Sequence, residues 1–430
     1  MINNFYQRIK NKILKLPLTV WVLLGFLLTF YLFFIVPVFF DPLQKMRFIE
    51  YILVLSPIGH DFNVLVSASS TWLHSGALPA TLYPPVILMF FVPFTFLNEG
   101  AGYRAIVLLI LFCYVLTTLI LPRRINGSKG LSALGMLVFI SGLVSYGLQF
   151  ELERGQWNLI AFTFCLTAIY IFHHHPDRRW LAYLLFTISI QLKLYPAIFV
   201  FAMIEDWSDW RNNIKRFVGL GLVNVAALFM FGLGPILSMF GSQGNIEAAH
   251  VGRNFNLSIS SFILNLLSLS FLPHRRIILW LQANSWLPQS FLFALFAVCF
   301  LIILRQAYKH NSKGLNPSVF LACTIGACLI PSISFDYKLS FFPASVMLLL
   351  PVFRSFEKGR QGFSIIFLTL LFSIAYSSML YSYANKPEIF QYDLPALFVL
   401  LGICILLAFV RSDEIAEPLE NAPEAGAVGQ

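Results

Sequence analysis

Long apolar runs recur along nearly the whole chain, and no other feature of the sequence constrains its fold as strongly. Of the 430 residues, 58% are hydrophobic and only 11% are charged, and the mean hydropathy is +0.77. Soluble domains carry about 25% charged residues, so this composition excludes a soluble globular fold. Runs of about 20 apolar residues are typical of transmembrane helices. We therefore predict an all-α polytopic membrane protein.

Ten segments are candidate spans, and two further segments resist simple counting. The candidates are residues 17–40, 102–121, 132–149, 157–172, 217–238, 287–304, 315–331, 339–353, 363–382 and 393–410. The run 86–97 is short and contains Pro93, and the run 181–204 is interrupted by Lys193. If 86–97 does not cross and 181–204 is a hairpin with Lys193 at its apex, most basic loops fall on one side, as the positive-inside rule requires. This interpretation predicts about 12 membrane segments with both termini in the cytoplasm.

The chain is predicted to hold one membrane domain, residues 1–410. Within it, residues 41–101 form a large extracytoplasmic loop of short amphipathic helices, with 86–97 as a re-entrant or interfacial segment. Residues 411–430, "RSDEIAEPLENAPEAGAVGQ", are acidic and lack aromatic residues, which predicts a disordered cytoplasmic tail. The net charge of +9 indicates a basic surface beside anionic membrane lipids, and we expect no nucleic-acid partner.

No cofactor is predicted. The six cysteines lie inside apolar runs without paired spacing, which indicates small hydrophobic residues and neither a disulfide framework nor a zinc site. The run His173 to His175 resembles a metal-binding tract, but its basic neighbours favour a solvated turn. The sequence contains no phosphate-binding loop or dinucleotide motif. An enzyme with this sequence would therefore need an activated donor carried by a lipid.

Five polar clusters fall on the extracytoplasmic side in the predicted topology. They are "GHDFN" (59–63), "ELERGQWN" (151–158), "LKLYP" (192–196), "GRNFNLSISS" (252–261) and "SISFDYKLS" (332–340). Their convergence on one face predicts a single outward-facing site.

Asp61 and Lys193 are the candidate chemical groups of this site. A partly desolvated carboxylate is a stronger base, so Asp61 is a candidate general base; the alternatives are a solvated loop residue or a cap of a helix that starts near Phe62. A lysine in an apolar stretch needs a cavity or a partner, and a phosphate suits an ammonium ion. The alternatives for Lys193 are pairing with Glu151 or Glu153, or snorkelling to the interface.

Other polar residues in the clusters are candidates for substrate binding. Glutamate, glutamine, asparagine and serine side chains suit sugar hydroxyls, although an interfacial charged turn before a helix is the commoner origin of a cluster such as "ELERGQWN". Asp336 and Lys338 suit phosphate binding or capping of the next helix. The candidate substrate-binding residues are His60, Tyr83, Glu153, Gln156, Asn158, Asn254, Asn256, Ser258 and Asp336.

The same clusters resemble a known family in their order. "DFNVLVSASSTWLHSGALPATLYPPVILMFFVPFTFL" (61–97) resembles the Asp-Phe and Tyr-Pro-Pro pattern of glycosyltransferase family 87, the polyprenyl-phosphate-mannose-dependent alpha-1,2-mannosyltransferases with the type C membrane fold. "ERGQWNLIAFTFCLTA", "KLYPAIFVF", "NFNLSISS" and "IPSISFDYKLSFFP" are similar to its later motifs. Each motif is weak alone, and five in order carry the resemblance over residues 59–345.

The resemblance implies inverting transfer of a hexose, mannose in that family, from a polyprenyl phosphate to a lipid-linked or glycan acceptor. It implies an active site on the extracytoplasmic face of a bacterial inner membrane, with Asp61 as the base, Lys193 near the donor phosphate and no metal. Two departures concern the site. Asn63 and Val64 stand where the family has aromatic residues, and Phe335 to Lys338 replace Trp-Asp-His-His, so that Lys338 is the candidate replacement for a phosphate-binding group.

Two other functions are consistent with the chain. A transporter or a lipid or glycan flippase accounts for many spans and an intramembrane lysine, but it predicts internal repeats, and the sequence shows none. A non-catalytic scaffold for a cell-envelope complex predicts that Asp61 and Lys193 are dispensable.

Overall fold

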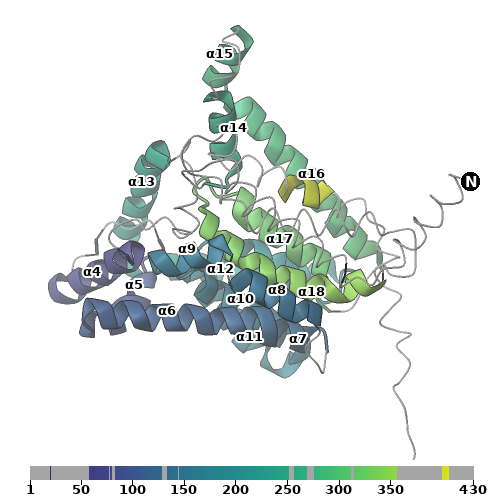
Figure 1. Ribbon diagram of the computed structural model, residues 1–430, viewed down its shortest axis with the longest axis horizontal. Coiled ribbons are helices and arrows are strands. Elements are labelled where there is room, and N and C mark those ends of the chain that lie inside the picture. The colour runs from purple at the N-terminus through teal and green to yellow at the C-terminus, as the bar shows by residue number, and fades with distance from the viewer. Residues whose placement is uncertain are drawn as a thin grey trace, which may run out of the picture.

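The described part of the protein is helical throughout. The computed structural model describes residues 20, 58–76, 78–79, 83–127, 133–143, 145–250, 256–268, 276–310, 314–355 and 400–405 (Figure 1). In these residues the only extended pairing is an isolated bridge between Asn256 and Phe335. The candidate spans 17–40 and 363–382, most of 393–410, the tail 411–430 and Asn254 lie outside the described residues.

Within the residues that the structure describes, three helices are long and apolar enough to cross a membrane. The first is continuous over Glu99–Ile125, where α6 (Glu99–Val115), the π-helical turn η4 (Leu116–Ile120) and α7 (Leu121–Ile125) follow without a break. The others are α12 (Trp210–Leu228) with η7 (Phe229–Phe231), and α16 (Trp286–His310). The expected span 132–149 corresponds to two helices, α8 (Ala133–Leu143) and α9 (Tyr146–Arg154), which are bent by 45° and form a fourth candidate span if the pair crosses as one. The helical membrane class is confirmed, and the count of about 12 segments stays a prediction.

Shorter helices make up the rest of the described chain. They are α4 (His60–Ser75), α5 (Ile87–Phe91), η3 (Val92–Phe96), α10 (Asn158–His174), η5 (Pro176–Arg178), α11 (Arg179–Leu192), η6 (Tyr195–Met203), α13 (Leu233–His250), α14 (Ile259–Ser268), α15 (Arg276–Ala283), α17 (Pro317–Leu329), η8 (Asp336–Phe341) and α18 (Phe342–Ser355). The ambiguous run 86–97 forms α5 and η3, which pack on α4 through Phe62.

The chain reverses direction at Lys193. At one end of α10, the Trp157 indole donates to the carbonyl of Leu192 (3.2 Å), and the Tyr195 hydroxyl donates to the carbonyl of Asn158 (2.8 Å). At the other end of α10, His173 Nε2 lies 2.8 Å from the carbonyl oxygen of Ala202. Thus α11 runs antiparallel to α10 as far as Lys193, and η6 runs back toward the end of α10. This is the hairpin that the interrupted run 181–204 suggested.

α12 then runs beside α11 in the same direction. Arg216 donates to the Tyr183 hydroxyl (3.2 Å), and eight residues further along both helices Gln191 donates to the carbonyl of Asn224 (3.1 Å). At about 1.5 Å per residue, the 17 residues of α10 separate the end of the bundle that holds Lys193 from the end that holds Arg178 and Arg179 by about 25 Å. The bundle therefore has two chemically distinct ends.

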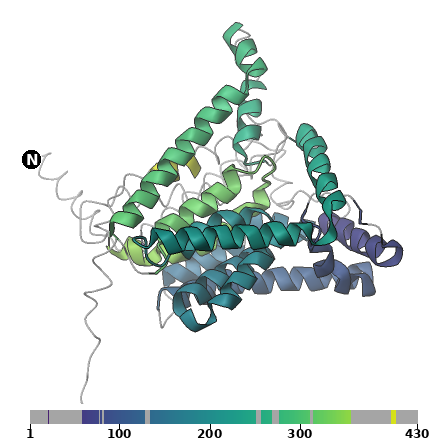
Figure 2. The same ribbon diagram turned by 180° about the vertical axis from the view of Figure 1, so that it is seen from behind.

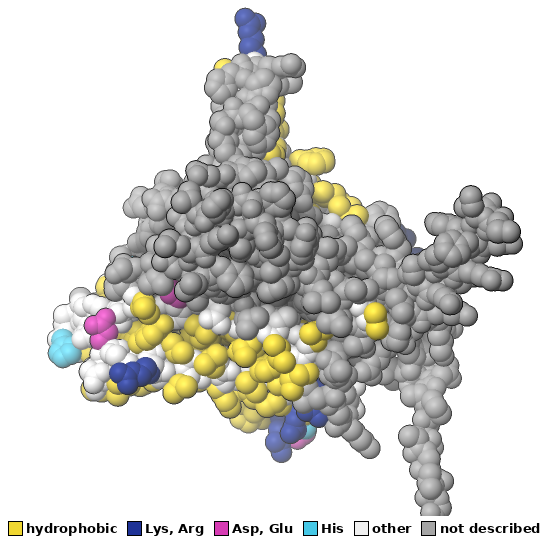
Figure 3. All heavy atoms as spheres, in the orientation of Figure 1, with side chains coloured by type: hydrophobic (Ala, Val, Ile, Leu, Met, Phe, Trp, Pro, Cys, Tyr) yellow, Lys and Arg dark blue, Asp and Glu magenta, His cyan; other side chains and the backbone are white. Residues whose placement is uncertain are grey.

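Aromatic packing fills the middle of the bundle. All the side chains of α17 are buried except that of its first residue, Pro317, and the ring of Phe162 on α10 stacks on Phe341 of η8 with centroids 4.8 Å apart. In Figure 3, hydrophobic side chains gather over the part of the surface where α6 and α8 lie. Leu108 and Phe112 of α6 and Ile140 of α8 are exposed. An apolar outer surface around a packed interior suits a helix bundle in lipid.

Candidate functional site

Asp61 lies in the first turn of α4, at the end of the bundle where Figure 1 shows α4, α5 and α9 together. The helix begins at His60 after Gly59, whose φ of 74° is in the left-handed region that glycine adopts without strain. The Gly59 amide donates to the carbonyl of Glu153 (2.8 Å), which fixes the start of α4 against the end of α9. The Asp61 side chain faces the end of α9, where Arg154 and Gln156 donate to it.

Gly155 allows α9 to end in direct contact with α4. Its φ is 62°, and a Cβ atom there would lie 2.7 Å from the Cβ of Phe62. The Gly155 amide donates to Leu152 and the Gln156 amide donates to Glu151, which closes the helix end. This turn places the side chains of Arg154 and Gln156 against Asp61.

Arg154 and Gln156 hold the Asp61 carboxylate. Arg154 Nη2 donates to Oδ1 (2.5 Å), Arg154 Nε donates to Oδ2 (3.1 Å), and Gln156 Nε2 also donates to Oδ2. A carboxylate has about four acceptor positions, so one remains for a further donor. The Asp61 side chain is 21% exposed, and an incoming hydroxyl can therefore reach it.

Lys193 is joined to Asp61 through the same glutamine. Its ammonium donates to Gln156 Oε1 (3.0 Å) and lies over the rings of Trp157 (4.0 Å) and Tyr83 (4.2 Å). Burial lowers the pKa of Lys193 to about 7, and the charge of Asp61 opposes that shift. Burial, followed by the nearby charge of Asp61, raises the pKa of Tyr83. Aromatic faces attract a desolvated cation, so the cage stabilises the ammonium form.

Glu151 ties α9 to two neighbouring elements. Its carboxylate accepts from the Leu159 amide (2.7 Å) and from the Ser340 hydroxyl of η8 (2.6 Å). Gly147 lets the two elements approach, since a Cβ there would lie 3.1 Å from the Asp336 carbonyl oxygen. These contacts fix η8 beside Asp61, Arg154, Gln156 and Lys193, which we call the Asp61 cluster.

The structure places the other predicted residues around this cluster at differing depths. Asp336 is fully buried on η8, and Lys338 donates to the carbonyl of Ala327 (3.0 Å). Burial lowers the pKa of Lys338 to about 8. Asn158 is buried with its amide 3.4 Å from Gln156 Oε1, whereas His60 is exposed. The contacts of Asp336 and Lys338 with phosphate stay predictions.

Asn256 and Ser258 are buried and bonded to the backbone before η8. Asn256 donates to the carbonyl of Ser332 (3.0 Å) and accepts from the Ser334 amide (2.9 Å), and the Ser258 hydroxyl donates to the Ser332 carbonyl (2.8 Å). These contacts account for both side chains as anchors of the loop 332–335. Their binding of sugar, like that of Glu153, stays a prediction.

Three important residues were not among the predicted site residues. Arg154 pairs with Asp61, Trp157 forms half of the aromatic cage, and Glu151 fixes η8. All three lie in the polar cluster "ELERGQWN" next to the predicted Gln156. The signal was thus their position beside a glycine that permits close approach.

Comparison with known proteins adds a family assignment. Residues 81–332 match the model of glycosyltransferase family 87. No curated protein matches the chain. The matched residues include Arg154, Gln156 and Lys193, whereas Asp61 lies before them.

Proposed function

The match covers more than half of the chain, so the protein belongs to glycosyltransferase family 87, and we propose that it transfers mannose from a polyprenyl phosphate to a lipid-linked or glycan acceptor. One observation carries this proposal: the Gln156 side chain alone separates the Asp61 carboxylate from the Lys193 ammonium. The base for the acceptor and the cation for the leaving phosphate act on opposite sides of one sugar ring, so the distance between them must be about the width of that ring. The single side chain between Asp61 and Lys193 gives a separation of this order.

Asp61 accepts the proton of the acceptor hydroxyl in this mechanism. The acceptor oxygen attacks the anomeric carbon as its proton passes to Asp61. The bond from that carbon to the phosphate oxygen breaks, and its electron pair stays on the phosphate. Attack opposite to the leaving group inverts the configuration. General-base assistance of this kind contributes about 10² to 10⁴ in rate.

Lys193 stabilises the charge that develops on the phosphate. A leaving phosphate monoester gains negative charge as the bond breaks, and a preorganised cation in a site shielded from water stabilises that charge strongly. Arg154 keeps the Asp61 carboxylate oriented toward the same space. We expect the site to open on the extracytoplasmic face of a bacterial inner membrane, where polyprenyl-linked sugars meet their acceptors.

The test of the base is Asp61→Asn in proteoliposomes supplied with labelled polyprenyl-phosphate mannose. We expect at least a 100-fold loss of transfer. The matched control is Asp177→Asn, which changes an exposed aspartate at the other end of α10 and should leave transfer unchanged. Undiminished transfer by Asp61→Asn would remove the base from the mechanism.

The sidedness of the site is tested by cysteine labelling in intact cells. The six native cysteines are all buried, so background labelling is low. Cysteines introduced at the exposed His60 and Leu194 should react with an impermeant reagent from outside, and one at the exposed Arg178 should not. Labelling of all three from the same side contradicts the proposed orientation.

A further inference from the structure

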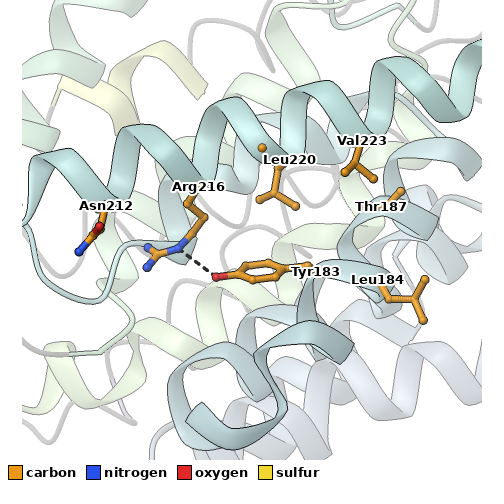
Figure 4. Close-up of a pocket in the computed structure, with 8 residues that line it drawn as sticks. Tyr183, Leu184, Thr187, Asn212, Arg216, Leu220 and Val223 are labelled. Carbon is orange, nitrogen blue, oxygen red and sulfur yellow. Dashed lines mark hydrogen bonds between the residues drawn. The ribbon is translucent and has the colours of Figure 1, made fainter.

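A cavity lies between α11 and α12, away from the Asp61 cluster. Its volume is about 420 Å³, within the range of small-molecule sites. Figure 4 shows its lining, and Figure 2 turns this side of the molecule toward the viewer. The lining residues are Tyr183, Leu184, Thr187, Asn212, Arg216, Gly219, Leu220 and Val223.

The cavity is polar at one end and apolar along the rest. Asn212 and Arg216 lie at the polar end, and Leu220, Val223 and Leu184 line the remainder (Figure 4). Arg216 is fixed there because its Nε donates to the Tyr183 hydroxyl, and its Nη1 donates to backbone and side-chain oxygens. Among the described residues its Nη2 makes no hydrogen bond, so it has donors to offer a ligand. This layout matches an amphiphile with a charged head and an apolar chain.

The surroundings of the polar end identify a membrane interface. Trp180 and Trp210 are exposed at the first turns of α11 and α12, and tryptophan is enriched at the level of lipid headgroups. Arg211 and Lys215 are exposed on the first turns of α12 and, with Arg216, outnumber the carboxylate of the cap residue Asp209, which accepts from Asn212. The helix beyond them is apolar and mostly exposed, as a lipid-facing span is.

We propose that this cavity binds one membrane phospholipid with an anionic headgroup. The headgroup lies against the Arg216 guanidinium, and one acyl chain follows Leu220 and Val223 between the helices. The site is distinct from that of the sugar donor, because ten residues of α11, about 15 Å, separate Tyr183 from Lys193. The positive charge at the mouth selects the anionic headgroup.

The test measures lipid retained by the full-length protein without any sugar donor. The protein is exchanged into nanodiscs of phosphatidylcholine containing a minor share of phosphatidylglycerol, released into mild detergent, and examined by native mass spectrometry. We expect one retained phosphatidylglycerol, favoured over phosphatidylcholine about fivefold, which corresponds to the ~1 kcal/mol typical of one basic residue near a membrane surface.

Two tryptophan variants on one helix separate the cavity from the general lipid-facing surface. Val223→Trp fills the cavity from a side chain that is 54% exposed, whereas Leu222→Trp, at a 66% exposed position outside the lining, is the control. We expect at least a tenfold loss of the retained lipid in the first variant and no loss in the second. Leu184→Trp fills the cavity from α11 and replaces the first variant if that variant does not fold.

Either of two results overturns the proposal. One is equal retention of phosphatidylglycerol and phosphatidylcholine by the unmodified protein, since the headgroup would then not be recognised. The other is equal retention by the cavity-filling and control variants, since the lipid would then bind elsewhere.

Discussion

Replacing Asp61 by asparagine should abolish transfer and at the same time tighten binding of the product phosphate. The two effects are opposite because Asp61 is proposed to act as the base while its negative charge repels the phosphate held at Lys193. The asparagine keeps the shape of the side chain and an oxygen that accepts from Arg154. The change therefore isolates the charge.

The magnitude follows from the spacing in the structure. Lys193 is 3.0 Å from Gln156, which itself contacts Asp61, so a phosphate bound to the ammonium lies about 6 Å from the carboxylate. With an effective dielectric constant of about 20 to 40 for this partly exposed position, repulsion between unit charges is about 1.4 to 2.8 kcal/mol. We expect binding to tighten by ~10- to 100-fold.

Isothermal titration of a short-chain polyprenyl phosphate into the detergent-solubilised protein measures this affinity. The comparison is between the unmodified protein, Asp61→Asn and the control Asp177→Asn, at one salt concentration and at a pH well below 7. Lys193 then stays charged in all three proteins, although loss of the Asp61 charge lowers its pKa. Melting temperatures of the three proteins establish that each is folded. Unchanged or weaker binding by Asp61→Asn, with transfer lost, would mean that the phosphate does not lie beside Lys193.

Three further changes test the pH dependence of the site and the packing beside it. Burial lowers the pKa of Lys193 to about 7, and a bound phosphate raises that pKa again because it favours the charged form. Binding of polyprenyl phosphate should therefore take up protons, and it should weaken as the pH rises above 7. Calorimetry in buffers of different ionisation enthalpy measures both effects. Ser340→Ala removes the 2.6 Å hydrogen bond to Glu151 and should cost about 1.5 to 3 kcal/mol of stability, seen as a lower melting temperature. Gly147→Ala places a Cβ 3.1 Å from the backbone of η8 and should cost about 1 to 3 kcal/mol, whereas Gly219→Ala, with no atom within 4 Å, should not lower the melting temperature.

The membrane class was predictable because it depends on composition, whereas helix boundaries depend on local contacts. The expected span 217–238 is a helix that begins at Trp210, where Asp209 accepts from the Asn212 amide (3.4 Å) as its cap. The hydropathy pattern assigned those first residues to a loop because Arg211 is charged, although basic side chains suit the interfacial turn of a membrane helix. The same span ends at Gly232, whose φ of 88° closes the helix before the apolar run does.

The predicted topology placed Asp61 and Lys193 on the same face of the membrane, but it did not predict that Gln156 joins them by hydrogen bonds. The positive-inside rule assigns segments to a face without stating which side chains meet. The ion pair between Asp61 and Arg154 joins residues 93 positions apart and depends on the left-handed turn at Gly155. The broken helix before that turn was also invisible in the sequence, since a bend of 45° leaves hydropathy unchanged.

The way Lys193 is compensated suits the phosphate-binding role that we propose for it. Among the described residues no carboxylate forms a salt bridge with it, and its contacts are one amide oxygen and the faces of Tyr83 and Trp157. A carboxylate in direct contact would neutralise the ammonium and compete with phosphate, whereas aromatic faces lower the cost of burial without supplying a full negative charge. Gln156 lies between Asp61 and Lys193, so the charge of Asp61 acts on the ammonium from a distance, and Arg154 is its direct ion-pair partner. The ammonium therefore retains most of its attraction for an incoming phosphate, and Lys193→Met should weaken phosphate binding more than any single change in the cage.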